Sequence, residues 1–227
     1  MLYRAILMDA DDTLFDFRTA ERLAITETLG GLGLNDPAAA DLYVRINEAC
    51  WKAFEQGLIT QSELKVMRFE KLLSALNLSA DPRAAGDTYL ASLARQRVLL
   101  PGAEEALAEI AACRPVAIVT NGIACVQRGR FEASPIRQYI SALVISEEFG
   151  HPKPHPGIFT HALGLLGGFA PGQALMIGDS LTSDMAGAIA AGVKTCWFNP
   201  DNRPCPEHMP LDHIIDKVED MPRVALK

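Results

Sequence analysis

The strongest constraint on the fold is a set of four short apolar runs, each of which ends in polar residues. Uninterrupted runs of this length suit strands that are buried on both faces of a parallel sheet. Helical patterns separate the later runs, and this alternation of strand and helix predicts an open α/β sheet. The runs occupy residues 6–8, 116–119, 142–145 and 174–177, and a fifth strand is expected at 193–198.

The stretch between residues 15 and 100 interrupts this alternation and has the pattern of four helices. Its helix-start signals are two Asp-Pro pairs, which combine an N-cap with a proline at the first helical position, and one capping box. These signals are Asp36-Pro37, Asp81-Pro82 and the pair Thr60 and Glu63. We therefore expect a helical bundle at residues 16–99, inserted into an α/β core formed by residues 1–15 and 100–227.

Carboxylates follow two of the apolar runs: Asp9 and Asp11 come after the first, and Asp179 and Asp184 after the fourth. The carboxyl ends of parallel strands meet at one edge of the sheet, which is where ligands bind in such folds. Two like charges about 4 Å apart repel by about 4 kcal/mol at an effective dielectric constant of about 20, so a cation is expected among these groups. Oxygen ligands without a nearby His or Cys favour Mg²⁺.

Groups suited to an anion follow the other two runs. Lys153 comes after the third run and adds a positive charge at the same edge. Thr120-Asn121-Gly122 follows the second run and offers a hydroxyl, an amide and backbone N–H groups, all of which suit phosphate oxygens. The edge is therefore expected to bind a phosphate group beside a metal ion.

In their order along the chain, these residues resemble the four motifs of the haloacid dehalogenase-like (HAD) hydrolases. The resemblance covers essentially the whole chain, and it implies a Rossmann-like parallel sheet with an inserted helical cap. Within that superfamily, residues 9–17, 54–69 and 195–200 are most similar to the pyrimidine 5′-nucleotidase type. The four matching segments are Asp9-x-Asp11-x-Thr13, Thr120-Asn121-Gly122, Lys153-Pro154 and Gly178-Asp179-Ser180-x-x-x-Asp184.

The resemblance implies a Mg²⁺-dependent phosphomonoester hydrolase that forms an aspartyl-phosphate. Asp9 would be the nucleophile, and Asp11 would act first as general acid and then as general base. Asp9 and Asp179 would bind Mg²⁺ through their carboxylates, and Asp11 through its backbone carbonyl. The other implied roles are phosphate binding for Thr120, Asn121 and Lys153, and supporting roles for Thr13 and for Asp184, which would hold metal-bound water or orient Lys153.

Composition excludes several other functions. Lys and Arg number 21 against 28 Asp and Glu, a net charge of −7 that argues against a nucleic-acid-binding surface. No apolar run approaches the ~20 residues of a membrane span, and no signal-peptide pattern is present. Five scattered cysteines without a CxxC pair predict neither a disulfide framework nor a zinc site. We expect a cytoplasmic enzyme whose partner is a small phosphorylated metabolite, with a nucleoside monophosphate as the leading candidate.

The sequence leaves four alternative functions open. A β-phosphoglucomutase-like or a phosphoglycolate phosphatase-like enzyme would share the nucleophile and the acid. Haloacid dehalogenation is disfavoured, because the branch that this chain resembles at the nucleophile lacks the carboxylate at the position of Asp11. A phosphate-binding regulatory protein would use the same scaffold without catalysis.

The sequence allows two positions for several residues of the expected cap. Trp51 and Phe54 would either pack in the core of the cap or stack on a nucleobase. Gln56, Gly57 and Arg68 would face either the site or solvent.

Overall fold

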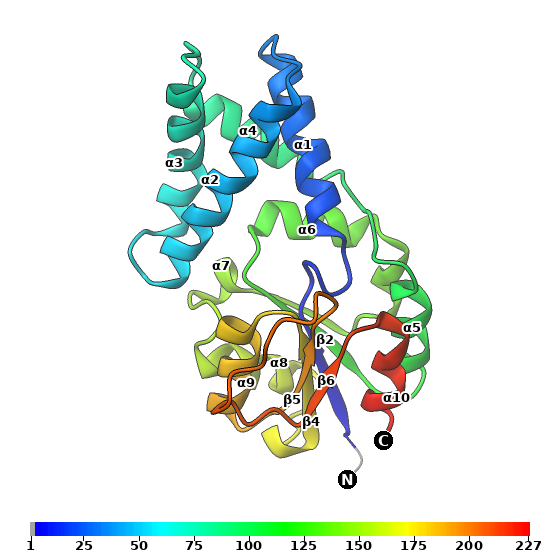
Figure 1. Cartoon of the computed structure of the whole chain (residues 1–227). Helices are drawn as coiled ribbons and strands as arrows, with labels where there is room; N and C mark the ends of the chain where they lie inside the picture. Colours follow the sequence, from blue (N-terminus) through cyan, green and yellow to red (C-terminus); the bar gives the residue numbers. More distant parts are fainter. Residues whose placement is uncertain (1–2) are drawn as a thin grey trace.

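The structure, a computed structural model, describes residues 3–227. Its six strands form one fully parallel sheet in the order β3-β2-β1-β4-β5-β6, which confirms the predicted α/β class (Figure 1). The strands are β1 (Ala5–Met8), β2 (Val116–Thr120), β3 (Ala142–Ile145), β4 (Ala174–Gly178), β5 (Lys194–Phe198) and β6 (His213–Ile215).

The sixth strand, β6, was not predicted from the sequence. It has only three residues, and it pairs with β5 through contacts such as Cys196 opposite His213. Of its side chains only Ile215 is buried, so β6 lacks the continuous apolar run that marks β1, β2, β3 and β4.

Helices cover both faces of the sheet, and β1 shows how its residues divide between them. Ile6 and Met8 contribute to an apolar cluster with α5 and α10. Ala5 and Leu7 point to the other face and pack in a second cluster with α8 and α9, as expected when successive side chains alternate. The core helices are α5 (Ala103–Ala111), α6 (Ala124–Glu132), α7 (Ser146–Phe149), α8 (Pro156–Leu165), α9 (Ala186–Ala191) and α10 (Met221–Ala225).

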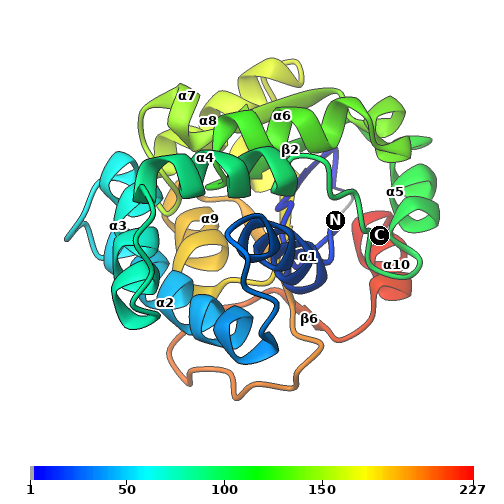
Figure 2. The same ribbon diagram turned by 90° about the horizontal axis from the view of Figure 1, so that it is seen from above.

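Four further helices form the predicted bundle, which stands above the carboxyl ends of the strands (Figures 1 and 2). The predicted start signals are all present: Asp36 and Asp81 cap the second and fourth helices, and Thr60 and Glu63 form both halves of a capping box. The helices are α1 (Phe17–Gly31), α2 (Pro37–Glu55), α3 (Gln61–Ala75) and α4 (Pro82–Leu93). Within residues 3–227, no helix is both long and apolar enough to cross a membrane.

The chain enters and leaves the bundle through two segments that pair with each other. The backbone N–H of Asp16 donates to the carbonyl of Val98 at 3.0 Å, and that of Leu100 donates to Leu14 at 2.9 Å. A single antiparallel bridge between Phe15 and Leu99 lies between these bonds. The bundle is thus joined to the sheet by a short two-stranded connection.

Helix α6 packs with both parts of the molecule. Its N-cap residue Ile123 and its residue Val126 belong to the apolar cluster of the bundle, whereas Phe131 belongs to a cluster on the sheet. At Gly129 the backbone of α6 approaches the end of α4 so closely that an added Cβ would lie 3.1 Å from the Cβ of Ala94. The boundaries that the sequence suggests, at residues 15/16 and 99/100, stay a prediction.

Candidate active site

The turn after β1 places two carboxylates at the edge of the sheet. The backbone N–H of Asp9 donates to Ile177 of β4 at 2.9 Å, which fixes the start of the turn beside the end of that strand. Asp12 adopts a φ of 56°, in the left-handed region that Asp tolerates better than most residues, and the chain turns back there. Asp9 and Asp11 both line the same cavity.

Three carboxylates from two strand ends converge at this edge. Asp9, Asp179 and Asp184 each offer an oxygen atom, and these oxygens all lie within 4.8 Å of one another. Asp184 lies on a short π-helix, residues Leu181–Met185, and accepts a hydrogen bond from the backbone N–H of Ser180 at 3.1 Å. At Gly178 an added Cβ would lie 2.3 Å from the Asp184 carboxylate, so only glycine leaves room for it there.

The buried amine of Lys153 joins two of these carboxylates. Its Nζ donates to Asp9 Oδ1 at 2.5 Å and to the carbonyl of Val119 at 2.7 Å, and it lies 2.7 Å from Asp184 Oδ1. Asn121 bonds to the backbone of the lysine on both sides: its Nδ2 donates to Lys153 O at 2.9 Å, and its Oδ1 accepts from Lys153 N at 2.8 Å. The Asn121 amide therefore holds the lysine loop in place.

The two motif threonines, Thr120 and Thr13, differ in their hydrogen bonds. The Thr120 hydroxyl accepts a hydrogen bond from the backbone N–H of Gly122 at 3.0 Å, and both residues line the cavity. Thr13 is fully buried behind the turn, and its hydroxyl has no hydrogen-bond partner within residues 3–227.

The acidic cluster carries more negative charge than its lysine balances. Burial raises the pKa of Asp9 to about 7 even though Lys153 acts to lower it. Burial, followed by repulsion from Asp9 and Asp184, raises the pKa of Asp179 well above its ordinary value. Burial alone would lower the pKa of Lys153, but Asp184 and Asp9 together raise it above its ordinary value. A buried oxygen-only donor set with uncompensated charge fits Mg²⁺, a hard cation that prefers carboxylate ligands.

Asp11 is held by two side chains of α6 that sequence reasoning missed. The guanidinium Nη1 of Arg130 pairs with Asp11 Oδ1, and Nε2 of Gln127 donates to Asp11 Oδ2 at 2.6 Å. Arg130 is completely buried, donates from Nε to the carbonyl of Gln96 at 3.1 Å and lies 4.1 Å above the ring of Phe15. The available signal was two polar residues three positions apart on the helix that follows Thr120, which places them on one helical face.

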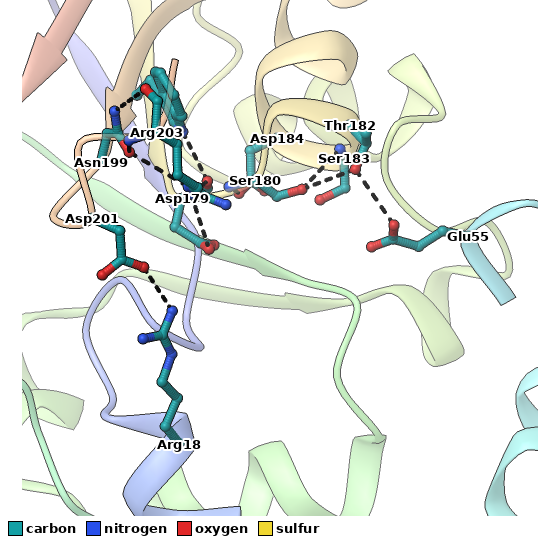
Figure 3. Close-up of polar contacts among 11 residues, drawn as sticks. Arg18, Glu55, Asp179, Ser180, Thr182, Ser183, Asp184, Asn199, Asp201 and Arg203 are labelled. Atoms are coloured by element: carbon teal, nitrogen blue, oxygen red, sulfur yellow. Dashed lines mark hydrogen bonds and ion pairs between the residues drawn. The ribbon is translucent and has the colours of Figure 1, made fainter. Parts of the chain in front are cut away.

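Asp179 also has partners that the motifs did not reveal, and they come from β5 and from the loop after it (Figure 3). Its backbone carbonyl accepts hydrogen bonds from Arg203 Nη2 at 2.7 Å and from Trp197 Nε1 at 2.9 Å. On the loop that carries Arg203, Asp201 pairs with Arg18 of α1 at 2.9 Å, so this loop contacts the bundle as well as the acidic cluster. These contacts join segments far apart in the sequence, where no local pattern predicts them.

A cavity of about 370 Å³ lies between the bundle and the sheet edge. Trp51 lines it, whereas Phe54 is half-buried and is not among the lining residues. Gln56 and Gly57 are exposed to solvent, but Arg68 is buried and lines the cavity. From the bundle, the lining residues are Phe17, Glu48, Trp51, Glu55, Arg68 and Leu93.

Comparison with known proteins agrees with this arrangement. A sequence profile of haloacid dehalogenase-like hydrolases matches residues 3–192. The chain belongs to the haloacid dehalogenase-like hydrolases. Among its HAD relatives are two proteins named pyrimidine 5′-nucleotidase. PynA of Streptococcus pneumoniae is 37% identical over 203 residues, which cover 88% of this chain and 85% of PynA. YjjG of Escherichia coli is 32% identical over 222 residues, which cover 98% of this chain and 97% of YjjG.

A solved HAD structure has the same fold over nearly the whole chain. The crystal structure of the HAD-hydrolase YfnB from Bacillus subtilis superposes with a TM-score of 0.92 at 31% sequence identity and covers 99% of each chain. YfnB was crystallised bound to magnesium, and its structure is described as revealing interdomain movement.

Proposed function

We propose that this HAD hydrolase is a phosphatase that hydrolyses small phosphomonoesters, and that its substrates are nucleoside monophosphates. The observation that carries the proposal is the placement of Asp9 against Lys153 in a buried acidic cluster that lines a ligand-sized cavity. The nucleotide part is supported by the 37% and 32% identity to PynA and YjjG.

In the proposed reaction, the Asp9 carboxylate attacks phosphorus and the bond from phosphorus to the ester oxygen breaks. Asp11 donates a proton to that oxygen and later takes a proton from the water that attacks the aspartyl-phosphate. This second step releases phosphate and restores the Asp9 carboxylate. Because Arg130 and Gln127 occupy both Asp11 oxygens, one of these contacts must yield before the proton moves.

Lys153 and the Thr120 hydroxyl are proposed to bind the phosphoryl oxygens, because both lie at the sheet edge beside Asp9. The side chains of Asp9 and Asp179 and the backbone carbonyl of Asp11 would hold Mg²⁺. When bound, that ion would offset negative charge on the transferred group. The ion pair between Asp184 and Lys153 favours the second of its two expected roles, which is orienting the lysine.

We further propose that the helices of residues 16–99 act as a cap that encloses the substrate. The cavity is lined from the sheet edge and from the bundle, so closure would exclude water from Asp9. Among the described residues, the polar contacts of α3 with the core are those of Lys65 with Glu147 at 2.5 Å and of Gln61 with the carbonyl of Asn121 at 3.3 Å. Exposed pairs of this kind are weak, which suits a part that opens and closes.

A hydrolysis screen with Mg²⁺ tests the proposal. We expect kcat/KM to be higher for dUMP and dTMP than for glucose phosphates or phosphoglycolate. Asp9→Asn should fold yet reduce turnover to background, whereas Asp87→Asn, an exposed carboxylate on α4, should change turnover less than twofold.

Substantial turnover by Asp9→Asn, or full activity in excess EDTA, would disprove the mechanism. A hexose phosphate or phosphoglycolate that exceeds every nucleotide tenfold would disprove the nucleotidase assignment alone.

A further inference from the structure

The guanidinium of Arg68, on α3, is buried in the bundle but only partly satisfied. Its side chain is 1% exposed and lines the cavity that also contains Asp9. Nη1 donates to Asn47 Oδ1 at 3.0 Å, whereas Nε and Nη2 have no hydrogen-bond partner within residues 3–227. Leaving a buried charged donor unpaired is unfavourable, so two free donors at a ligand cavity indicate a group that the ligand supplies.

Contacts from the other three helices of the bundle fix the position of this guanidinium. Asn47 of α2 is itself held in place, because its Nδ2 donates to Glu21 Oε1 of α1 at 2.6 Å. The Arg68 guanidinium lies 4.8 Å from the centre of the Tyr89 ring of α4, within the range of a cation–π contact. Since the guanidinium is oriented before a ligand arrives, it loses little conformational freedom on binding.

The acidic residues of the cavity favour a neutral ligand edge over a second anion. Glu48 and Glu55 of α2 also line the cavity, so a further carboxylate or phosphate there would meet negative charge as well as the guanidinium. A group that presents a carbonyl oxygen next to an N–H satisfies both kinds of side chain: the oxygen accepts from Arg68, and the N–H donates to a carboxylate. A pyrimidine base with its C4 carbonyl and N3–H, as in uracil and thymine, has this edge.

We propose that Arg68 selects the leaving group by donating a hydrogen bond to a carbonyl oxygen of a pyrimidine base, and that Asn47 and Glu21 are positioning residues. This inference rests on the proposed nucleotidase function and names the side chain that would recognise the base. A hydrogen bond to a charged group contributes about 1.5–3 kcal/mol, which corresponds to a tenfold to hundredfold change in kcat/KM.

The test compares two substrates that differ only in the base: dUMP and 2-deoxyribose 5-phosphate. Arg68→Met, which keeps an unbranched apolar stem and loses the donors, should lower kcat/KM for dUMP at least tenfold more than for the abasic substrate. Arg68→Lys, which keeps the charge but loses the planar set of guanidinium donors, should show a smaller selective loss of kcat/KM for dUMP. The matched control is Lys71→Met on the exposed side of the same helix, where the ratio of the two kcat/KM values should stay within twofold.

Turnover of the abasic substrate also reports folding, because the reacting groups belong to the sheet edge. If Arg68→Met does not fold, the selective loss in Arg68→Lys decides the question. Asn47→Ala should give a selective loss for dUMP that is smaller than that of Arg68→Met. An equal loss for both substrates would show that Asn47 is merely structural.

The outcomes separate this inference from the proposed function. A wild-type enzyme that does not prefer dUMP to 2-deoxyribose 5-phosphate would refute base recognition, and with it both proposals. If the wild type prefers dUMP but Arg68→Met and Arg68→Lys keep that preference, the assignment of Arg68 is wrong while the nucleotidase stands. If Arg68→Met impairs phosphoglycolate more than dUMP, Arg68 binds a carboxylate and the assignment to a carbonyl is overturned.

Discussion

Unlike Asp9 and Asp184, which pair with Lys153, Asp11 is bound by two side chains of α6. Arg130 and Gln127 occupy its two oxygens, and Arg130 is fixed in turn by the ring of Phe15 and the carbonyl of Gln96. Phe15 and Gln96 lie near the two segments that connect the bundle to the sheet. The group proposed to transfer protons is therefore tied to the region where the cap would move.

Replacing Asp11 by Asn removes the proposed proton transfer while preserving most of the side-chain volume. Acid–base catalysis typically contributes about 10²–10⁴-fold, so kcat for dUMP should fall by that order. The loss should be smaller for p-nitrophenyl phosphate, whose leaving group needs little protonation. Steady-state kinetics on both esters measures the difference, and equal losses would assign Asp11 a purely structural role.

Glu21, in the bundle, makes the stability of the folded chain depend on pH. Burial raises the pKa of Glu21 to about 7 from an ordinary 4.5, although Asn47 and Arg68 act to lower it. Because the folded chain binds this proton more tightly than the unfolded chain, the contribution to stability is complete below about pH 4.5. It is lost as the pH rises through about 7.

The melting temperature of Glu21→Gln, measured relative to that of the wild type, should therefore be higher at pH 8 than at pH 5. Glu70→Gln, an exposed change on α3, should show no such gain. Thermal unfolding at both pH values is the measurement. A pH-independent difference between Glu21→Gln and the wild type would contradict the shifted pKa.

At the scale of helices and strands, two glycines in the helical layer under the sheet have opposite surroundings. A Cβ added at Gly187 of α9 would lie 2.5 Å from the Phe159 ring and 2.9 Å from the backbone of Pro154. At Gly164 of α8 no atom lies within 4 Å of an added Cβ. Gly187 thus permits close contact of α9 with α8, whereas Gly164 only adds freedom to the unfolded chain.

Gly187→Ala should lower the free energy of unfolding by about 1–3 kcal/mol, the usual cost of overpacking. Gly164→Ala should raise it by about 0.4–1 kcal/mol, because alanine restricts the unfolded chain. Urea unfolding of the two variants measures both changes. The close contact at Gly187 would be ruled out by a neutral result there.

The elements that sequence analysis predicted are those with a local signature. Four strands carry uninterrupted apolar runs, a fifth follows the glycine that ends a helix, and the bundle carries helix caps, so these elements were found. Strand β6 was missed because one buried residue makes no pattern. The motif residues could be placed together because they follow strands of one parallel sheet. Arg130, Gln127 and Arg203 could not, since their contacts depend on how α6 and the loop after β5 pack on the finished sheet.

At the scale of the whole molecule, the bundle and the sheet have separate apolar clusters that meet along α6. The sheet keeps helices on both faces without the bundle, so a chain in which a short linker replaces residues 18–98 should still fold. We expect this capless enzyme to hydrolyse phenyl phosphate but to lose most of the preference for dUMP over 2-deoxyribose 5-phosphate. Circular dichroism and kinetics on the three esters provide the measurement, and an undiminished preference would show that selectivity resides in the core.

The position of α6 also determines where this protein can be recombined with its relatives. A graft limited to residues 16–99 would set a foreign bundle against Ile123, Val126 and the close approach at Gly129, a surface shaped for the original helices. The same helix delivers Gln127 and Arg130 to Asp11, so a misfit there would disturb the proposed proton donor as well. The natural unit of exchange is therefore the bundle together with residues 123–132. Chimaeras that exchange residues 123–132 together with the bundle should retain turnover far more often than chimaeras that exchange the bundle alone.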